Sequence, residues 1–327
     1  MWGGAPEVWQ SPDTSSVTHL NANWYPSKTN SLERFKKMRL SFGIKTAPQS
    51  TTYEDMKRVW LEADSIPSIE HAWLFDHFMP INGDTGGPCL EGWSLLSAFA
   101  ALTSRLRIGL MVTGNTYRYP AVLANIGATV DVISGGRLDF GIGAGWNETE
   151  HHAYGIPLYT AGERIRRLGE ACEVIRLMWT ETAPSFEGKY YQIKDAYCEP
   201  KPVQKPYPPF VIGGGGEKLT LRVVAKSAAI CNFIGTGPED FQRKSSILDE
   251  HCAAIGRDPQ TIQRSVGSPA VNPANLGETR DLVRSYIEVG ATHLILNLRV
   301  LNTPYPEGIV HRLDEEIIRP LKAEFEG

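Results

Sequence analysis

A histidine and an aspartate stand side by side just after a short apolar segment. Residues 72–75 are typical of a buried strand, and Asp76 and His77 follow it directly. An imidazole exchanges protons near neutral pH, and a neighbouring carboxylate can orient it or hydrogen-bond to a cofactor. We therefore predict that His77 and Asp76 are catalytic, and a purely structural histidine is the alternative.

A run of four glycines indicates a second kind of chemistry, the binding of a phosphate. The run follows a predicted strand at residues 210–212 and precedes a predicted helix, so main-chain N–H groups can face an anion. A second loop follows the next predicted strand and can close over the same group. The residues of the two loops are Gly213, Gly214, Gly215, Gly216, Gly235, Thr236 and Gly237. Two tight turns without a ligand are the alternative, and no Gly-Lys-Ser/Thr sequence ends the run to make a P-loop.

Strand-like and helix-like segments alternate from residue 39 onward. The expected strands are residues 40–44, 72–75, 108–112, 138–142, 210–212, 229–234, 262–266 and 293–298. Eight strands alternating with helices predict an α/β fold, a (β/α)8 TIM barrel with an insertion at residues 183–209. The alternative is a doubly wound open sheet. That fold usually carries glycines after its first strand, where this chain has Lys45-Thr46-Ala47-Pro48.

Composition excludes several classes of protein. The chain has 327 residues, 42% of them hydrophobic, and its net charge of −4 without a basic block argues against nucleic-acid or membrane binding. No segment reaches the roughly 20 apolar residues that span a bilayer. Five scattered cysteines without metal or redox spacing fit a reducing, cytoplasmic location, and no metal site is expected.

Two further features concern the chain's start and its other histidines. Residues 1–37 lack periodicity, so we predict a disordered extension or a misassigned start, followed by one domain at residues 38–327. His71 is expected at a helix end in solvent. His293 opens the last strand at the N-terminal end of the barrel, the face associated with stability. His151 and His152 are adjacent on an expected helix and therefore point in different directions.

The ordered set of motifs resembles the luciferase-like monooxygenase superfamily, and most of all its branch that uses coenzyme F420, an 8-hydroxy-5-deazaflavin. The longest match is TGNTYRYPAVLANIGATVDVISGGRLDFGIGAGWNETEHHAYGIP, at residues 113–157. Shorter matches are AWLFDHF at 72–78, FEGKYY at 186–191, PKPVQ at 200–204 and IGGGGEKLTLR at 212–222. The resemblance covers residues 38 to 321 in the same order.

The resemblance implies a flavin or deazaflavin at the C-terminal mouth of a luciferase-like barrel. A bulge in the third strand, often with a cis peptide, would back the ring system, and the loop after the fourth strand would lie along the ring or its ribityl chain. The residues of these two segments are Met111, Val112, Thr113, Gly114 and Asn115, then Gly143, Ala144, Gly145, Trp146 and Asn147. The glycine loops would hold the phosphate, and His77 would donate or accept a proton. A homodimer is also implied.

One position departs from the family pattern. Sugar-phosphate dehydrogenases of the deazaflavin branch carry a catalytic glutamate after the fourth strand, where this chain has Trp146, followed by Asn147 and Glu148. This difference argues against glucose-6-phosphate as the substrate. It favours a small apolar or aromatic organic molecule.

Three hypotheses about function follow. The first is a cytoplasmic F420-dependent oxidoreductase that transfers a hydride between F420 and a small organic substrate. The second is an FMN-dependent monooxygenase that activates O₂ with flavin reduced by a partner reductase. The third is a cofactor carrier or sensor without turnover. The first two differ in cofactor electronics, because a deazaflavin reacts poorly with O₂.

Overall fold

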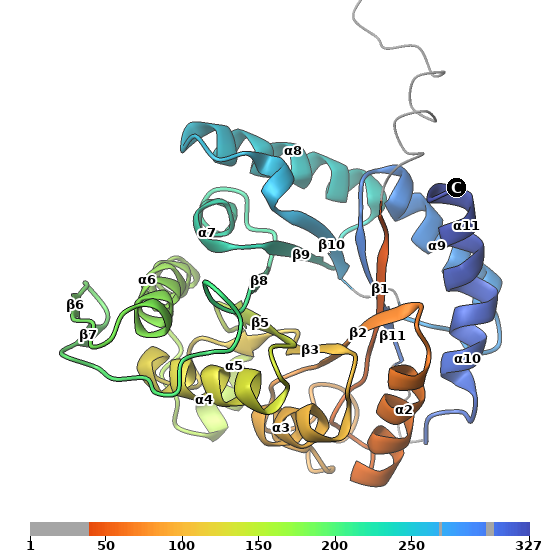
Figure 1. The fold of residues 1–327 in the computed structure, drawn as a ribbon, viewed down its shortest axis with the longest axis horizontal. Helices are drawn as coiled ribbons and strands as arrows, with labels where there is room; N and C mark the ends of the chain where they lie inside the picture. The colour runs from red at the N-terminus through yellow and green to blue at the C-terminus, as the bar shows by residue number, and fades with distance from the viewer. Residues whose placement is uncertain (1–38, 268–269, 299–303) are drawn as a thin grey trace, which may run out of the picture.

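Eight parallel strands close into a barrel, with the helices outside it (Figure 1). The computed structural model describes residues 39–267, 270–298 and 304–327, so the expected extension at residues 1–37 lies outside the described residues. Around the barrel, the strands are β3 (Arg107–Leu110), β2 (Ile69–Leu74), β1 (Ser41–Lys45), β11 (His293–Asn297), β10 (Gln263–Gly267), β9 (Ile230–Ile234), β8 (Phe210–Gly213) and β5 (Leu138–Gly143). Pairing of β3 with β5 closes the ring. The TIM barrel is therefore confirmed.

The helices follow the strands in the expected alternation. They are α2 (Tyr53–Ser65), α3 (Gly92–Leu102), α4 (Pro120–Ile133), α5 (Glu148–Ala153), α6 (Ala161–Thr180), α7 (Thr220–Ser227), α8 (Pro238–Ala254), α9 (Leu276–Glu288), α10 (Ile309–Leu313) and α11 (Arg319–Phe325). A π-helical turn, η2 (Asp314–Ile318), joins α10 to α11, and a 3-10 turn, η1 (Pro259–Thr261), precedes β10. Among the described residues, no helix is long and apolar enough to cross a membrane.

The expected insertion is an antiparallel hairpin beside α6 (Figure 1). Its strands are β6 (Phe186–Glu187) and β7 (Gln192–Ile193), and Glu170 on α6 accepts hydrogen bonds from the main chain between them. One further short strand, β4 (Thr113–Gly114), follows β3 and pairs with β5. The loop that carries β4 is therefore held against the C-terminal end of β5.

Glycines on neighbouring strands make room for large side chains inside the barrel. A Cβ on Gly43 would lie 1.8 Å from Nδ1 of His71, and one on Gly109 would lie 2.5 Å from the ring of Trp73. Trp73 is fully buried in a small interior cluster that is separate from the larger core. Side chains therefore fill the barrel, and any ligand must bind at one of its ends.

The N-terminal end of the barrel holds two buried, stacked imidazoles. The ring centroids of His71 and His293 are 3.9 Å apart, and the indole N–H of Trp73 donates to Nδ1 of His71 over 2.7 Å. Ser265 contacts Nδ1 of His293 at 3.0 Å. The expectation of a solvated His71 is wrong, because β2 begins at Ile69 instead of residue 72 and Gly43 leaves space for the ring.

Acid is expected to destabilise this end of the barrel. Burial, followed by the charges of Arg107 and Lys322, lowers the pKa of His71 to about 3, and burial beside His71 lowers the pKa of His293 as well. An unfolded histidine has a pKa near 6.5, so the unfolded chain binds more protons as the pH falls below that value. Each ring should then reduce the free energy of unfolding by about 1.4 kcal/mol per pH unit.

Urea unfolding at about pH 7 and pH 5 measures this effect. The variant His293→Gln should lose about half of the pH-dependent decrease between these two values, because one proton-binding ring remains. An unchanged decrease in the variant would contradict the assignment of the acid sensitivity to the stacked pair.

Candidate active site

A cavity of about 420 Å³ lies at the C-terminal ends of the barrel strands. The predicted site residues that line it are Asp76, His77, Met111, Val112, Gly114, Gly143, Ala144, Gly145, Trp146, Gly213 and Gly214. The lining residues that sequence reasoning did not select are Lys45, Phe75, Ile81, Tyr117, Ala161, Arg164, Ile165, Thr220 and Ile234. Segments far apart in the chain therefore converge on one space, as the barrel topology requires.

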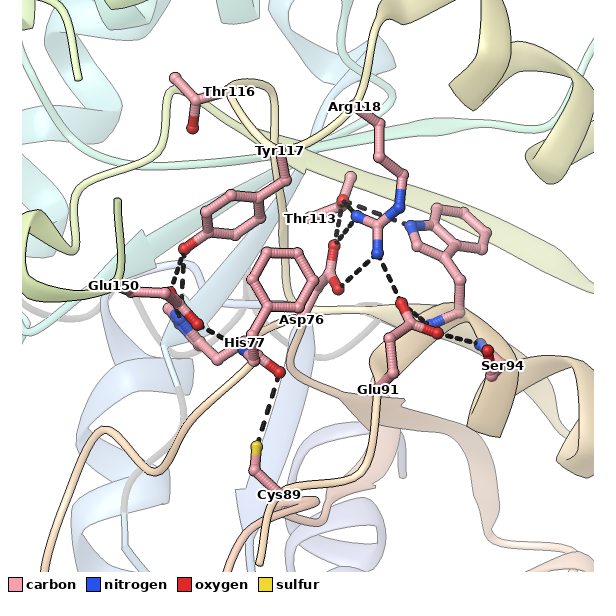
Figure 2. Close-up of polar contacts among 12 residues, drawn as sticks. Asp76, His77, Cys89, Glu91, Ser94, Thr113, Thr116, Tyr117, Arg118 and Glu150 are labelled. Atoms are coloured by element: carbon pink, nitrogen blue, oxygen red, sulfur yellow. Dashed lines mark hydrogen bonds and ion pairs between the residues drawn. The ribbon is translucent and has the colours of Figure 1, made fainter. Parts of the chain in front are cut away.

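His77 is paired with a buried carboxylate from α5 (Figure 2). Its Nδ1 lies 2.7 Å from Oε2 of Glu150, and the same carboxylate accepts hydrogen bonds from the main-chain N–H of Phe78 and the hydroxyl of Tyr117. Burial raises the pKa of Glu150, but the hydrogen bonds from His77, Tyr117 and Phe78 outweigh burial and lower this pKa overall. Glu150 is therefore an ionised partner for the imidazole.

Asp76 is held by a second network on the other side of His77 (Figure 2). Its carboxylate is fully buried, lies 2.6 Å from the Arg118 guanidinium and accepts the hydroxyl proton of Thr113. Arg118 also donates to Glu91, which caps the first turn of α3. Burial raises the pKa of Asp76, and Arg118 and Thr113 oppose that rise. These contacts anchor the turn that carries His77.

The bulge after β3 faces the glycine-rich loops. The peptide between Met111 and Val112 is cis, and both residues line the cavity. The Val112 side chain occupies the space that side chains at the ends of the neighbouring strands β5 and β8 would need. A Cβ on Gly143 would lie 2.7 Å from Val112, and one on Gly213 would lie 3.1 Å from it. Main chain rather than side chain therefore forms this part of the cavity.

The two predicted phosphate loops are not equally placed. Gly213 and Gly214 line the cavity, whereas Gly215 lies beside Lys244, whose Nζ would be 3.3 Å from a Cβ there, and Gly216 lies beside Thr220. Gly214 has a φ of +128°, which L side chains rarely adopt. The second loop, which precedes α8, does not line the cavity, and its residues are Gly235, Thr236 and Gly237. The side chain of Thr236 is buried, and its carbonyl accepts from Tyr286.

Three other residues that were predicted to bind the cofactor form hydrogen bonds to other residues of the protein. Thr113 binds Asp76, and the Asn115 amide donates to the Tyr191 hydroxyl over 3.1 Å. The side chain of Asn147 accepts from the main-chain N–H of Glu150 and so caps α5. The spacing Asn147-x-x-Glu150 matches a capping box, a signal that would have placed Glu150 at the start of a helix.

Trp146 and Arg164 shape the rim of the cavity. Trp146 is 62% exposed, and its ring meets that of His77 edge-on with centroids 5.7 Å apart. Arg164 donates from Nε to the carbonyl of Gly145 over 3.0 Å. Gly145 has a φ of +79°, and a Cβ there would lie 2.4 Å from Oγ1 of Thr116. The expected aromatic wall is thus an exposed edge of the cavity.

Comparison with known proteins identifies similar sequences. The family described as luciferase-like monooxygenase matches residues 39–315. An F420-dependent glucose-6-phosphate dehydrogenase of Amycolatopsis mediterranei is 33% identical over 69% of this chain and 68% of that protein. An uncharacterized protein of Mycobacterium tuberculosis is 30% identical over 67% of this chain and 75% of that protein.

Solved structures share the fold. An F420-dependent secondary alcohol dehydrogenase in complex with an F420-acetone adduct has a TM-score of 0.76, 17% identity, and coverage of 86% of this chain and 98% of that chain. A long-chain alkane monooxygenase has a TM-score of 0.70, 13% identity, and coverage of 88% and 91%. At such low identity, these structures support the barrel architecture alone.

Proposed function

Because the chain belongs to the luciferase-like monooxygenase family, we propose that it is an F420-dependent oxidoreductase that transfers a hydride between coenzyme F420 and a small organic substrate. The relatives named as F420-dependent glucose-6-phosphate dehydrogenases support the cofactor. The observation that carries the proposal is the His77–Glu150 pair at the edge of a cavity in which five of the lining residues are glycines. That arrangement offers a proton carrier beside a surface open to a flat ring.

The residues present fit a planar, anionic cofactor. Gly143, Gly145 and Gly214 present main chain without side chains to the cavity, and Lys45 and Arg164 give the lining positive charge. When bound, F420 supplies the ring that accepts or returns a hydride. Met111 and Val112 would back that ring, and Gly213 and Gly214 would lie toward its phosphate.

His77 would carry the proton that accompanies hydride transfer. In the oxidative direction, the imidazole takes the proton that an alcohol hydroxyl loses as it becomes a carbonyl. In the reductive direction, the imidazolium returns it to the carbonyl oxygen. The ionised carboxylate of Glu150 stabilises the charged ring between these events.

FMN-dependent oxygenation is the second candidate, because the family that this chain belongs to is described as luciferase-like monooxygenase. That reaction would need a flavin reductase as a partner. Titrating cofactor-free protein with F420 and, separately, with FMN decides between the two. We expect F420 to bind and FMN not to bind. A preference for FMN would support oxygenation, and binding of neither would contradict both.

The substrate is proposed to be small and apolar or aromatic. By the resemblance of the sequence motifs, Trp146 stands where sugar-phosphate dehydrogenases of this branch carry a glutamate. Its exposed ring borders the cavity. Trp146→Ala is expected to raise KM about tenfold for an apolar alcohol, with a smaller change in kcat, because burial against the indole contributes to binding. Turnover restricted to sugar phosphates in a substrate screen would contradict this proposal.

A homodimer stays part of the proposal. Exposed apolar side chains occur on α3 and α4 and just before α4, and they are Leu102, Tyr119, Val122, Val132 and Ile133. A second copy on this face would remove them from water. Sedimentation at micromolar concentration should show a dimer, and a monomer would contradict it. The free cysteines support a reducing, cytoplasmic location.

A further inference from the structure

We propose that Glu150 is the positioning residue that holds the proton of His77 on Nδ1 and so makes Nε2 the nitrogen that faces the reaction. The proton transfer rests on the proposed function, whereas the position of the proton does not. Glu150 lies behind the ring, is fully buried, and is absent from the residues that line the cavity. It can therefore act only through His77 and Tyr117.

Three hydrogen-bond donors converge on the two oxygens of this carboxylate. The main-chain N–H of Phe78 donates to Oε1, and His77 and the Tyr117 hydroxyl both contact Oε2 (Figure 2). A carboxylate only accepts hydrogen bonds, so the imidazole must be the donor, and Nδ1 carries the proton. Neutral imidazole has one N–H, so Nε2 then holds a lone pair that can accept a proton.

The other groups around His77 are compatible with this arrangement, because the Tyr117 hydroxyl, 3.4 Å from Nδ1, donates its own proton to Glu150. Burial, followed by the negative charges of Glu150 and Asp76, raises the pKa of the Cys89 thiol to about 12, so the thiol stays neutral where it contacts the His77 carbonyl. Burial and the hydrogen bond to Glu150 raise the pKa of Tyr117, which remains a donor. The charged groups on the remaining sides are Asp76, neutralised by Arg118, and Lys45 and Arg164 in the cavity lining.

The contacts of the first turn of α5 position the Glu150 carboxylate beside His77. Asn147 caps the helix and binds the main-chain N–H of Glu150, and in a capping box the side chain of Glu150 would return to the cap. Instead it reaches His77, 73 residues earlier in the chain. His151 bridges the Asn147 carbonyl and Thr116 and ties this turn to the loop that carries Tyr117.

The decisive variant is Glu150→Gln. The fixed N–H of Phe78 will retain the amide oxygen, which turns the NH₂ group toward Nδ1 of His77. The imidazole must then accept at Nδ1 and move its proton to Nε2. Proton-coupled ¹⁵N spectra of histidine-labelled, cofactor-free protein measure this directly, with His77→Asn used to assign the resonance among the eight histidines.

We expect the Nδ1–H form of His77 in the wild-type protein and the Nε2–H form in Glu150→Gln. Glu148→Gln is the matched control, because it makes the same change at an exposed site on the first turn of α5, and it should keep the Nδ1–H form. An Nε2–H ring in the wild-type protein would overturn the proposal, even if the variant does not fold. An Nδ1–H ring in Glu150→Gln would overturn it as well.

Kinetics give a second readout of the same residue. With F420 and a substrate, Glu150→Gln should lower kcat about tenfold or more, shift the acid limb of the rate profile, and leave KM nearly unchanged. Glu150→Asp should recover part of the rate. If the spectra behave as expected but the protein binds no F420, the proposed function fails and the role of Glu150 stands.

Discussion

Replacing His77 with alanine is expected to lower kcat by about 10²–10⁴-fold, the usual contribution of a positioned acid–base group. Coenzyme affinity should change little, because the proposed ring and phosphate positions are lined by Met111, Val112, Gly213 and Gly214, which belong to other strand ends. Among the residues that the structure describes, the change removes the only imidazole in the cavity lining. Stopped-flow absorbance with F420 and an alcohol or ketone substrate would measure the rate, and fluorescence titration the affinity.

Two outcomes would contradict this expectation. A His77→Ala protein with unchanged turnover would make the histidine structural and return the site to the carrier or sensor hypothesis. Loss of F420 binding together with activity would place His77 in cofactor binding instead of proton transfer. His152→Ala is a suitable control, because His152 is exposed on α5 next to the buried His151 and should leave both quantities unchanged.

The barrel could be predicted from the sequence because apolar strands and turn residues are local signals. The positions of Asp76, His77 and Gly213 at one end followed from the rule that parallel strand ends meet at one face. Glu150 was not predicted, although it is the direct partner of His77. The capping-box spacing from Asn147 places Glu150 in the first turn of a helix, but a charged residue there is usually solvated, so nothing local indicates that Glu150 is buried against His77.

Contacts between distant segments account for the other differences. Gly235 and Gly237 have the composition of a phosphate loop, but they do not line the cavity. Ile234, the last residue of β9, lines it instead. His71 was expected in solvent because it was placed at a helix end, yet it lies in a strand and is buried where Gly43 on the adjacent strand lacks a side chain. The burial of His71 depends on Gly43, 28 positions earlier in the chain, and a local sequence pattern does not contain such a contact.

Substitution of Gly141 by alanine is expected to be the most damaging single-methyl change near the site. A Cβ there would lie 1.7 Å from the main-chain carbonyl oxygen of Leu110 and 3.4 Å from Val112. Overpacking usually costs about 1–3 kcal/mol, and a clash with main chain cannot be relieved by a change of rotamer, so we expect a loss of more than about 3 kcal/mol. Urea unfolding followed by circular dichroism measures this loss.

The same variant links the fold to the site. Leu110 immediately precedes Met111, so the carbonyl can retreat from a methyl group on residue 141 only if the bulge that lines the cavity moves with it. Any folded Gly141→Ala protein should therefore bind F420 more weakly. Gly169→Ala on α6 is the control, because its Cβ would meet only Val223 at 3.6 Å, and alanine in a helix should stabilise by up to about 1 kcal/mol. A Gly141→Ala protein as stable as the wild type would contradict this expectation, because it would show that the main chain at these strand ends can move. The strand ends would then not hold the proposed cofactor site in a fixed geometry.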